Sequence, residues 1–210
     1  MQSAIKSTIF ILGLSLSIHA QAAPFSSINC THTENPQSKG KLQLKYNEDQ
    51  LKKLTHNATV YSYGQNGREE TSIEQTPHVA VRVGDASFTG SNRGEWGGEL
   101  VLVEASGDTK ILFKDNIHDI YNTKNGVIVI SGLSHLMTNK GRIYLITKNE
   151  STIDYQILFG LDSAPEDSWI TDSGEIFITT SYGTSILKQN GTLQRVLCEG
   201  HEYYKYNGNP

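Results

Sequence analysis

The sequence predicts an all-β fold built from repeated units of four antiparallel strands. One observation is an internal repeat, because an aromatic segment, a glycine turn and an alternating apolar strand occur at 119–130 and again at 167–178. A second is that hairpins begin directly after Gly98, Gly141 and Gly183, which lie 43 and 42 residues apart. Repetition on this scale indicates small stacked sheets, since one unit alone cannot bury its apolar faces.

Each strand is expected where apolar residues alternate between turn residues. The order is a hairpin at 41–54 with an added strand at 59–63, one less regular unit, two regular units and a tail strand at 201–206. No helix longer than a short turn is expected. The strands of the less regular unit are expected at 71–75, 79–83, 99–104 and 110–113. Those of the regular units are expected at 117–122, 127–131, 142–147 and 153–159, and at 167–171, 175–180, 184–188 and 192–197.

Over residues 40–197 this pattern resembles that of a β-propeller. The chain is similar in this to exported bacterial β-propeller-like repeat proteins of unknown function. The resemblance depends on the blade length and on the strand, glycine turn and strand pattern, because WD and kelch signatures are absent. It implies four-stranded blades arranged around an axis. The alternative is a β-sandwich or an open repeat stack, since three and a half units are few for a closed ring.

Residues 1–22 have the features of a signal peptide. Lys6 precedes a short apolar stretch, and Ala20-Gln21-Ala22 is a small-residue cleavage motif. The apolar stretch is too short to span a bilayer, and no later segment is apolar enough, so no membrane span is expected. The sequence therefore predicts a periplasmic or secreted protein with one domain over 23–210.

The charge of the mature chain argues against a nucleic-acid ligand. Without the leader, 17 basic and 22 acidic residues remain, and the basic ones are scattered. A nucleic-acid-binding domain instead carries a basic patch or stripe. We therefore expect no nucleic-acid partner.

The two cysteines, Cys30 and Cys198, lie near opposite ends of the mature chain. In an exported protein an even number of cysteines indicates a disulfide. A metal site is disfavoured, because neither cysteine has a CxxC or CxxH neighbour. Two buried free thiols are the alternative.

Function is expected in the connections between the second and third strands of the units, at 84–98, 132–140 and 181–183. In an antiparallel meander these connections open at the same end as the inter-unit loop 160–166. Loops on a rigid scaffold often carry function. The candidate ligand-binding residues are Arg93, Glu95, Trp96, His135 and Tyr182.

The stretch 93–98 is the strongest candidate. Trp96 offers a flat stacking surface for a sugar or a peptide, and Arg93 and Glu95 offer directional polar groups. The competing interpretation is structural: Trp96 fills the core between two units, and Arg93 and Glu95 pair with each other.

Three functions remain open, and no catalytic residue, metal or cofactor is assigned. The first is a module that binds a protein, peptide or glycan. The second is a small hydrolase or lyase in which His118, His135 and Glu95 meet around an axial pocket. The third is a structural component of an envelope assembly with an uncovered strand edge near 41–54. No hydrolase, phosphate-loop or EF-hand motif is present in the sequence.

Overall fold

A computed structural model describes most of the chain, and the described part is almost entirely β. The described residues are 26–28, 30, 46–65, 67–148 and 152–200. The expected signal peptide, the strand expected at 41–45 and the tail strand at 201–206 lie outside these residues. No helix of the described residues is long and apolar enough to cross a membrane.

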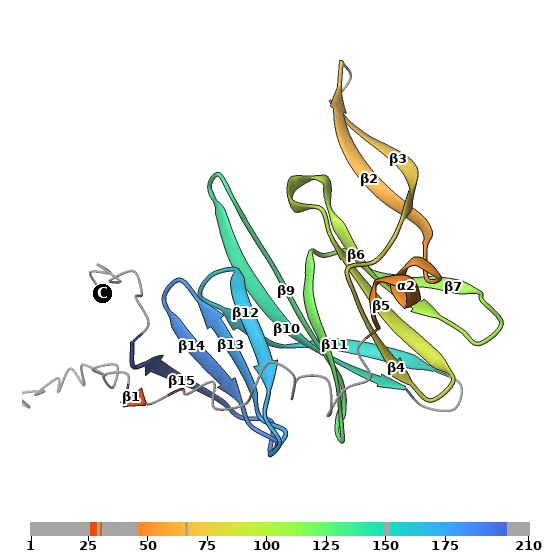
Figure 1. Cartoon of the computed structure of the whole chain (residues 1–210). Coiled ribbons are helices and arrows are strands. Elements are labelled where there is room, and N and C mark those ends of the chain that lie inside the picture. The colour runs from red at the N-terminus through yellow and green to blue at the C-terminus, as the bar shows by residue number, and fades with distance from the viewer. Residues whose placement is uncertain (1–25, 29, 31–45, 66, 149–151, 201–210) are drawn as a thin grey trace, which may run out of the picture.

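Three sheets of four antiparallel strands follow one another along the chain, and within each sheet the strands lie in chain order (Figure 1). The first sheet comprises β4 (Val79–Val83), β5 (Ala86–Asn92), β6 (Gly98–Val103) and β7 (Thr109–Phe113). The second comprises β8 (Ile117–Thr123), β9 (Gly126–His135), β10 (Thr138–Lys148) and β11 (Ile153–Leu161). The third comprises β12 (Pro165–Ile170), β13 (Ile176–Thr180), β14 (Gly183–Leu187) and β15 (Leu193–Cys198).

Two apolar clusters stack the three sheets face to face. Phe88 and Leu100 of the first sheet pack with Val129 of the second, and Ile130 of the second packs with Ile178 of the third. All five side chains are fully buried. Within the described residues the sheets do not close on one another, which fits the alternative to a propeller, a β-sandwich or an open repeat stack. The propeller ring is not shown.

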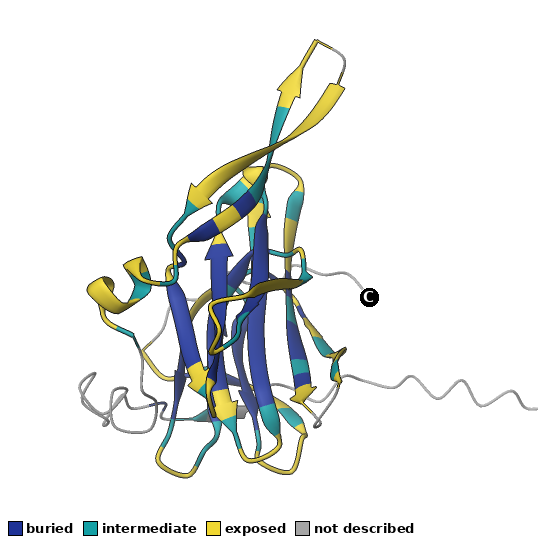
Figure 2. Cartoon of the chain, turned by 90° about the vertical axis from the view of Figure 1, so that its right-hand side faces the viewer, coloured by how far each residue is buried: buried dark blue, intermediate teal, exposed yellow. Residues whose placement is uncertain are grey.

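A separate hairpin of β2 (His56–Gly64) and β3 (Gly67–Gln75) projects from this body (Figures 1 and 2). We call it the arm. Nearly all of β3 is exposed, whereas the central strands of the body are buried. The strand expected at 71–75 is therefore not part of the first sheet, and the one expected at 59–63 lies within β2.

The short helix α2 (Glu48–Lys52) replaces the second strand of the expected hairpin at 41–54. Its start is a capping box: the Asn47 side chain accepts the Gln50 backbone N–H, and the Gln50 side chain accepts that of Asn47. This reciprocal pair satisfies two backbone donors that a helix start leaves free. The prediction of a strand here was therefore wrong.

The prediction of a loop over 84–98 is wrong for about half of that segment, which forms β5. Gly84 has a positive φ of 62° in a two-residue turn, after which Ala86 pairs with Val83. The strand carries small polar residues that suggest a loop, yet Phe88 and Thr89 are completely buried. Because β5 lies in the middle of the sheet with both faces covered, it forms a strand although its local composition favours a loop.

The loop expected at 132–140 is instead a continuation of the hairpin between β9 and β10. His135 pairs with Thr138, so only Leu136 and Met137 form the turn. The hairpin extends beyond the strands beside it, toward the end of the molecule from which the arm also projects (Figure 1). The turn at 181–183 is as expected, with Ser181 and Tyr182 joining β13 to β14.

Two of the three recurring glycines, Gly98 and Gly141, have a common structural role. A Cβ at Gly98 would lie 2.4 Å from the Ser91 carbonyl oxygen and 2.6 Å from that of Asp115, which belongs to the linker to the next sheet. A Cβ at Gly141 would lie 2.7 Å from the carbonyl oxygen of Ser163, in the following linker. At these two positions the repeat therefore places glycine where a linker backbone packs directly on a strand.

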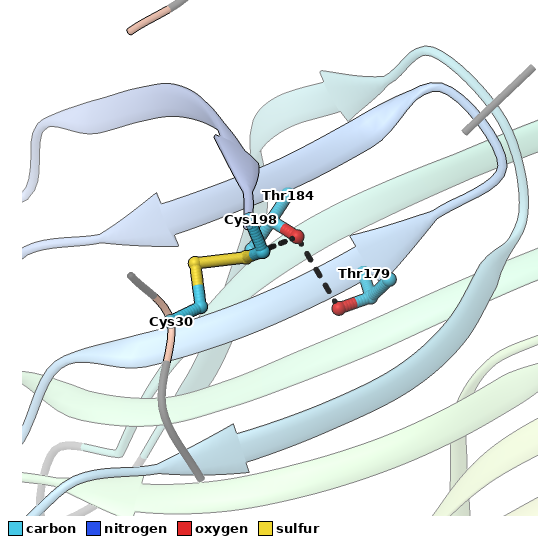
Figure 3. Close-up of a disulfide and its surroundings, with 4 residues drawn as sticks. All are labelled: Cys30, Thr179, Thr184 and Cys198. Carbon is cyan, nitrogen blue, oxygen red and sulfur yellow. Dashed lines mark hydrogen bonds between the residues drawn. A yellow bond between two sulfur atoms is a disulfide. The ribbon is translucent and has the colours of Figure 1, made fainter. Parts of the chain in front are cut away.

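The predicted disulfide is present between Cys30 and Cys198, with a Cα–Cα distance of 5.0 Å (Figure 3). It fastens the N-terminal strand β1 (Ser26–Ile28), which pairs in parallel with β15 and enlarges the third sheet to five strands. The Cys198 sulfur lies 3.2 Å from the Thr184 hydroxyl. Because a disulfide sulfur carries no hydrogen, Thr184 is the donor in this contact.

Candidate functional site

The connection between β5 and β6 is a single 3₁₀ turn, η1 (Gly94–Trp96), held in place by backbone hydrogen bonds. Arg93 N–H donates to the Gly97 carbonyl oxygen (2.9 Å), and Gly97 N–H donates to that of Gly94 (3.1 Å). Both glycines have a positive φ, 60° at Gly94 and 93° at Gly97, which other residues adopt at a cost. The sequence thus folds this segment into a fixed turn that presents Glu95 and Trp96.

Arg93 does not pair with Glu95, as the structural interpretation of the sequence expected. Its guanidinium donates to the Thr59 carbonyl oxygen of β2 (2.6 Å) and to the Ser91 hydroxyl of β5 (2.8 Å). Desolvation lowers the pKa of this group, which the nearby Glu99 carboxylate partly opposes. Arg93 therefore joins the arm to the first sheet through these two contacts.

A buried ion pair lies behind Arg93 at the base of the arm. His56 of β2 approaches the Glu99 carboxylate of β6 at 3.5 Å, and both side chains are almost completely buried. The nearby Glu99 carboxylate raises the pKa of His56, while desolvation opposes the rise. The arm is thus fixed to the body by charged groups, a feature that the separate positions of these residues in the sequence did not indicate.

Glu95 and His135, two predicted site residues from neighbouring sheets, do come together. The Glu95 carboxylate lies 2.8 Å from His135 Nε2, and both side chains are roughly two-fifths exposed. This pair ties η1 to the end of β9, which lies against it. The prediction that these connections share one end of the molecule is therefore confirmed for the first two sheets.

Trp96 is not a core residue, because 46% of its surface is exposed. The Glu95–His135 pair joins the turn of Trp96 to the β9–β10 hairpin turn, which carries Leu136, 92% exposed, and Met137, fully exposed. We call these three side chains, Trp96, Leu136 and Met137, the tip patch. The interpretation of Trp96 as a plug between the units was wrong.

The backbone of the hairpin turn is strained at Leu136. Its φ of 48° makes it the one non-glycine residue with a positive φ within the described chain. Two-residue hairpin turns normally place glycine, asparagine or aspartate at such positions. A bulky residue held in this region without packing contacts is more typical of a functional site than of a structural one.

The arm borders this surface at η1. A Cβ at Gly97 would lie 2.9 Å from the ring of Tyr61, so Tyr61 of β2 packs directly on the backbone that follows η1. The Arg68 guanidinium covers that ring at 3.5 Å from its centroid, and Lys114 reaches it at 5.4 Å. The arm is therefore positioned next to the tip patch by packing as well as by the buried charges.

Tyr182 and His118 lie elsewhere. Tyr182 is half-buried on the turn between β13 and β14 of the third sheet, where its backbone N–H donates to the Thr180 hydroxyl. His118 lines a small cavity of about 180 Å³ together with His78 and Tyr46, and neither Glu95 nor His135 is part of its lining. The expected convergence of His118, His135 and Glu95 is therefore not found.

Sequence reasoning missed Leu136 and Met137, although the sequence carries a signal for them. Leucine and methionine at the turn of a hairpin are unusual, but only the strand pairing shows that the turn falls there. Within the described ranges, no group of three or more His, Cys, Asp or Glu residues is arranged to hold a metal ion. Comparison with known proteins finds no matching family model, curated protein or solved structure.

Proposed function

We propose that this protein is an exported binding module whose tip patch docks onto a protein or peptide. The observation that carries the proposal is the tip patch itself: three exposed apolar side chains on two turns that the Glu95–His135 pair joins at one end of the sheet stack. Exposed apolar groups gathered in this way are typical of interaction sites. Aromatic residues and methionine are enriched at such interfaces.

The composition of the patch favours a protein or peptide over a glycan. Leu136 and Met137 are flexible aliphatic side chains that adapt to an apolar partner surface. A sugar would instead need flat aromatic rings and several directional polar groups, and the patch has one such ring, Trp96. The Glu95–His135 pair supplies a polar rim beside it.

The expected export supports the same proposal. The signal-peptide pattern at the N-terminus predicts a periplasmic or secreted location, and the Cys30–Cys198 disulfide is of the kind that persists in oxidising compartments. A binding module in such a compartment would meet other exported proteins or peptides.

The two other functions have less support. A His135 base oriented by Glu95 resembles part of a hydrolytic site, but His118 lies in a separate cavity. The uncovered strand edge expected near 41–54 is a helix over 48–52, and residues 41–45 lie outside the described chain. We therefore prefer binding.

Peptide display against the folded protein tests the proposal. Selected peptides should lose at least about 30-fold in affinity for Trp96→Ala, the effect expected of a central interface residue. They should lose a similar amount for the Leu136→Ser/Met137→Ser double variant.

The control is Ile157→Ser on β11, which removes one apolar side chain that is 57% exposed. This control should leave the affinity unchanged. Peptides that bind the tip variants as well as the wild type, or that lose affinity only for the β11 control, would show that the tip patch is not the binding surface.

A further inference from the structure

A cavity of about 650 Å³ lies between the second and third sheets, at the end opposite the tip patch. It opens between the turn that joins β8 to β9 and the turn that joins β14 to β15. Its size lies within the range of about 300–1,000 Å³ that is usual for small-molecule sites. Its walls are aliphatic and consist of Ile128, Leu145, Leu158, Ile170, Ile176 and Leu187.

The corresponding interface between the first and second sheets is filled by aromatic side chains. Phe113 of β7 stacks on Tyr144 of β10, with ring centroids 4.4 Å apart, and packs on Tyr155 of β11 at 4.9 Å. The two interfaces are built from the same kind of four-stranded sheet. Stacking of these sheets therefore does not by itself require an open space between them.

The rim of the cavity is polar and includes cationic groups. Lys124 Nζ donates to the side-chain oxygen of Gln189 at 2.5 Å, and the Asn125 amide donates to the Gln189 carbonyl oxygen at 2.8 Å. The partner of Lys124 in this contact is a neutral amide, so the contact leaves its charge uncompensated. Lys188, also on the rim, pairs with Glu175 at 2.8 Å.

We propose that this cavity binds a single-chain aliphatic acid. The chain would lie between the aliphatic walls, and the carboxylate would meet Lys124 at the rim. An apolar interior with a few polar groups at the mouth is the usual design of a small-molecule site, and the polar groups fix the orientation of the ligand. A carboxylate placed at an ammonium group keeps a charged hydrogen-bond partner, which it would lose inside the apolar walls.

Isothermal titration of the full mature protein with decanoate tests the site. Saturable binding is expected, and decyltrimethylammonium, which has an alkyl chain of similar length and the opposite charge, should bind at least about tenfold more weakly. Lys124→Gln should weaken decanoate binding at least about tenfold, the size expected for one charge-assisted hydrogen bond. The matched control is Lys110→Gln on β7, also an exposed lysine but outside the lining, and it should leave binding unchanged.

A second pair of variants tests the walls. Leu145→Phe should reduce decanoate affinity by filling the cavity, whereas Leu112→Phe, which enlarges a half-buried leucine at the other interface, should not. Equal affinity for decanoate and decyltrimethylammonium, or unchanged affinity in Lys124→Gln, would overturn the proposal. Capture of anionic phospholipid vesicles without decanoate binding would also overturn it, because the ligand would then be a two-chain lipid.

Discussion

Replacement of Leu136 by glycine is expected to stabilise the protein, although glycine usually weakens a β-structure. The Leu136 side chain is 92% exposed, so almost no buried apolar surface is lost. Its φ of 48° lies in the left-handed region, which costs a residue with a Cβ about 1–2 kcal/mol. Glycine adopts this conformation without that cost.

The expected gain follows from two opposing effects. Relief of the strain contributes about 1–2 kcal/mol, and the greater freedom of glycine in the unfolded chain removes roughly 0.5–1 kcal/mol. The net gain in the free energy of unfolding lies between about 0 and 1.5 kcal/mol. For a chain of this size the middle of that range corresponds to a rise in Tm of roughly 1–3 °C.

Met137→Gly provides the matched control. Met137 is equally exposed and follows Leu136 in the same turn, but its φ is not positive. It should therefore show only the cost of glycine, a loss of roughly 0.5–1 kcal/mol. Urea unfolding of both variants measures the contrast, and an equal loss of stability in the two would refute the inference of strain at Leu136.

Three further results are expected. A Cys30→Ser/Cys198→Ser variant should lose up to about 5 kcal/mol of unfolding free energy, which the chain-entropy model gives for a loop of 168 residues. Thiol titration of the denatured wild type should detect no free thiol. Because the folded-state pKa of His56 is raised, its ion pair stabilises the protein fully below the unfolded-state pKa near 6.5 and loses this effect as the pH rises through the folded-state pKa. The stability difference between the wild type and His56→Gln should therefore shrink between pH 6 and pH 9. A constant difference would contradict the ion pair. Gly98→Ala should destabilise the protein, because its Cβ would meet two backbone oxygens, whereas Gly160→Ala, where a Cβ meets nothing within 4 Å, should be neutral or slightly stabilising in the same urea titration.

The regular part of the fold could be predicted because local and long-range signals agree there. In the second and third sheets, alternating apolar residues, the glycine starts and the Asn190–Gly191 turn all specify the same strands. In β5 they disagree. Ser87, Thr89 and Ser91 suggest a loop, and only their position between β4 and β6 makes them buried strand residues.

The site could be predicted in part for a similar reason. The topology of a meander places second-to-third connections at one end, and this brings Glu95 to His135. What the sequence could not show is the length of the β9–β10 hairpin, which moves His135 to the end of a long strand and exposes Leu136. The attachment of the arm through Glu99 also depends on contacts between residues far apart in the chain.

The most direct test of the tip patch as the binding surface is a map of backbone amide chemical shifts during titration with a selected peptide. The account predicts changes concentrated at 94–97 and 133–139, on η1 and the β9–β10 hairpin, with residues 122–125 and 188–191 at the opposite end unaffected. Changes concentrated at that opposite end, or along β11, with the tip unchanged, would contradict it.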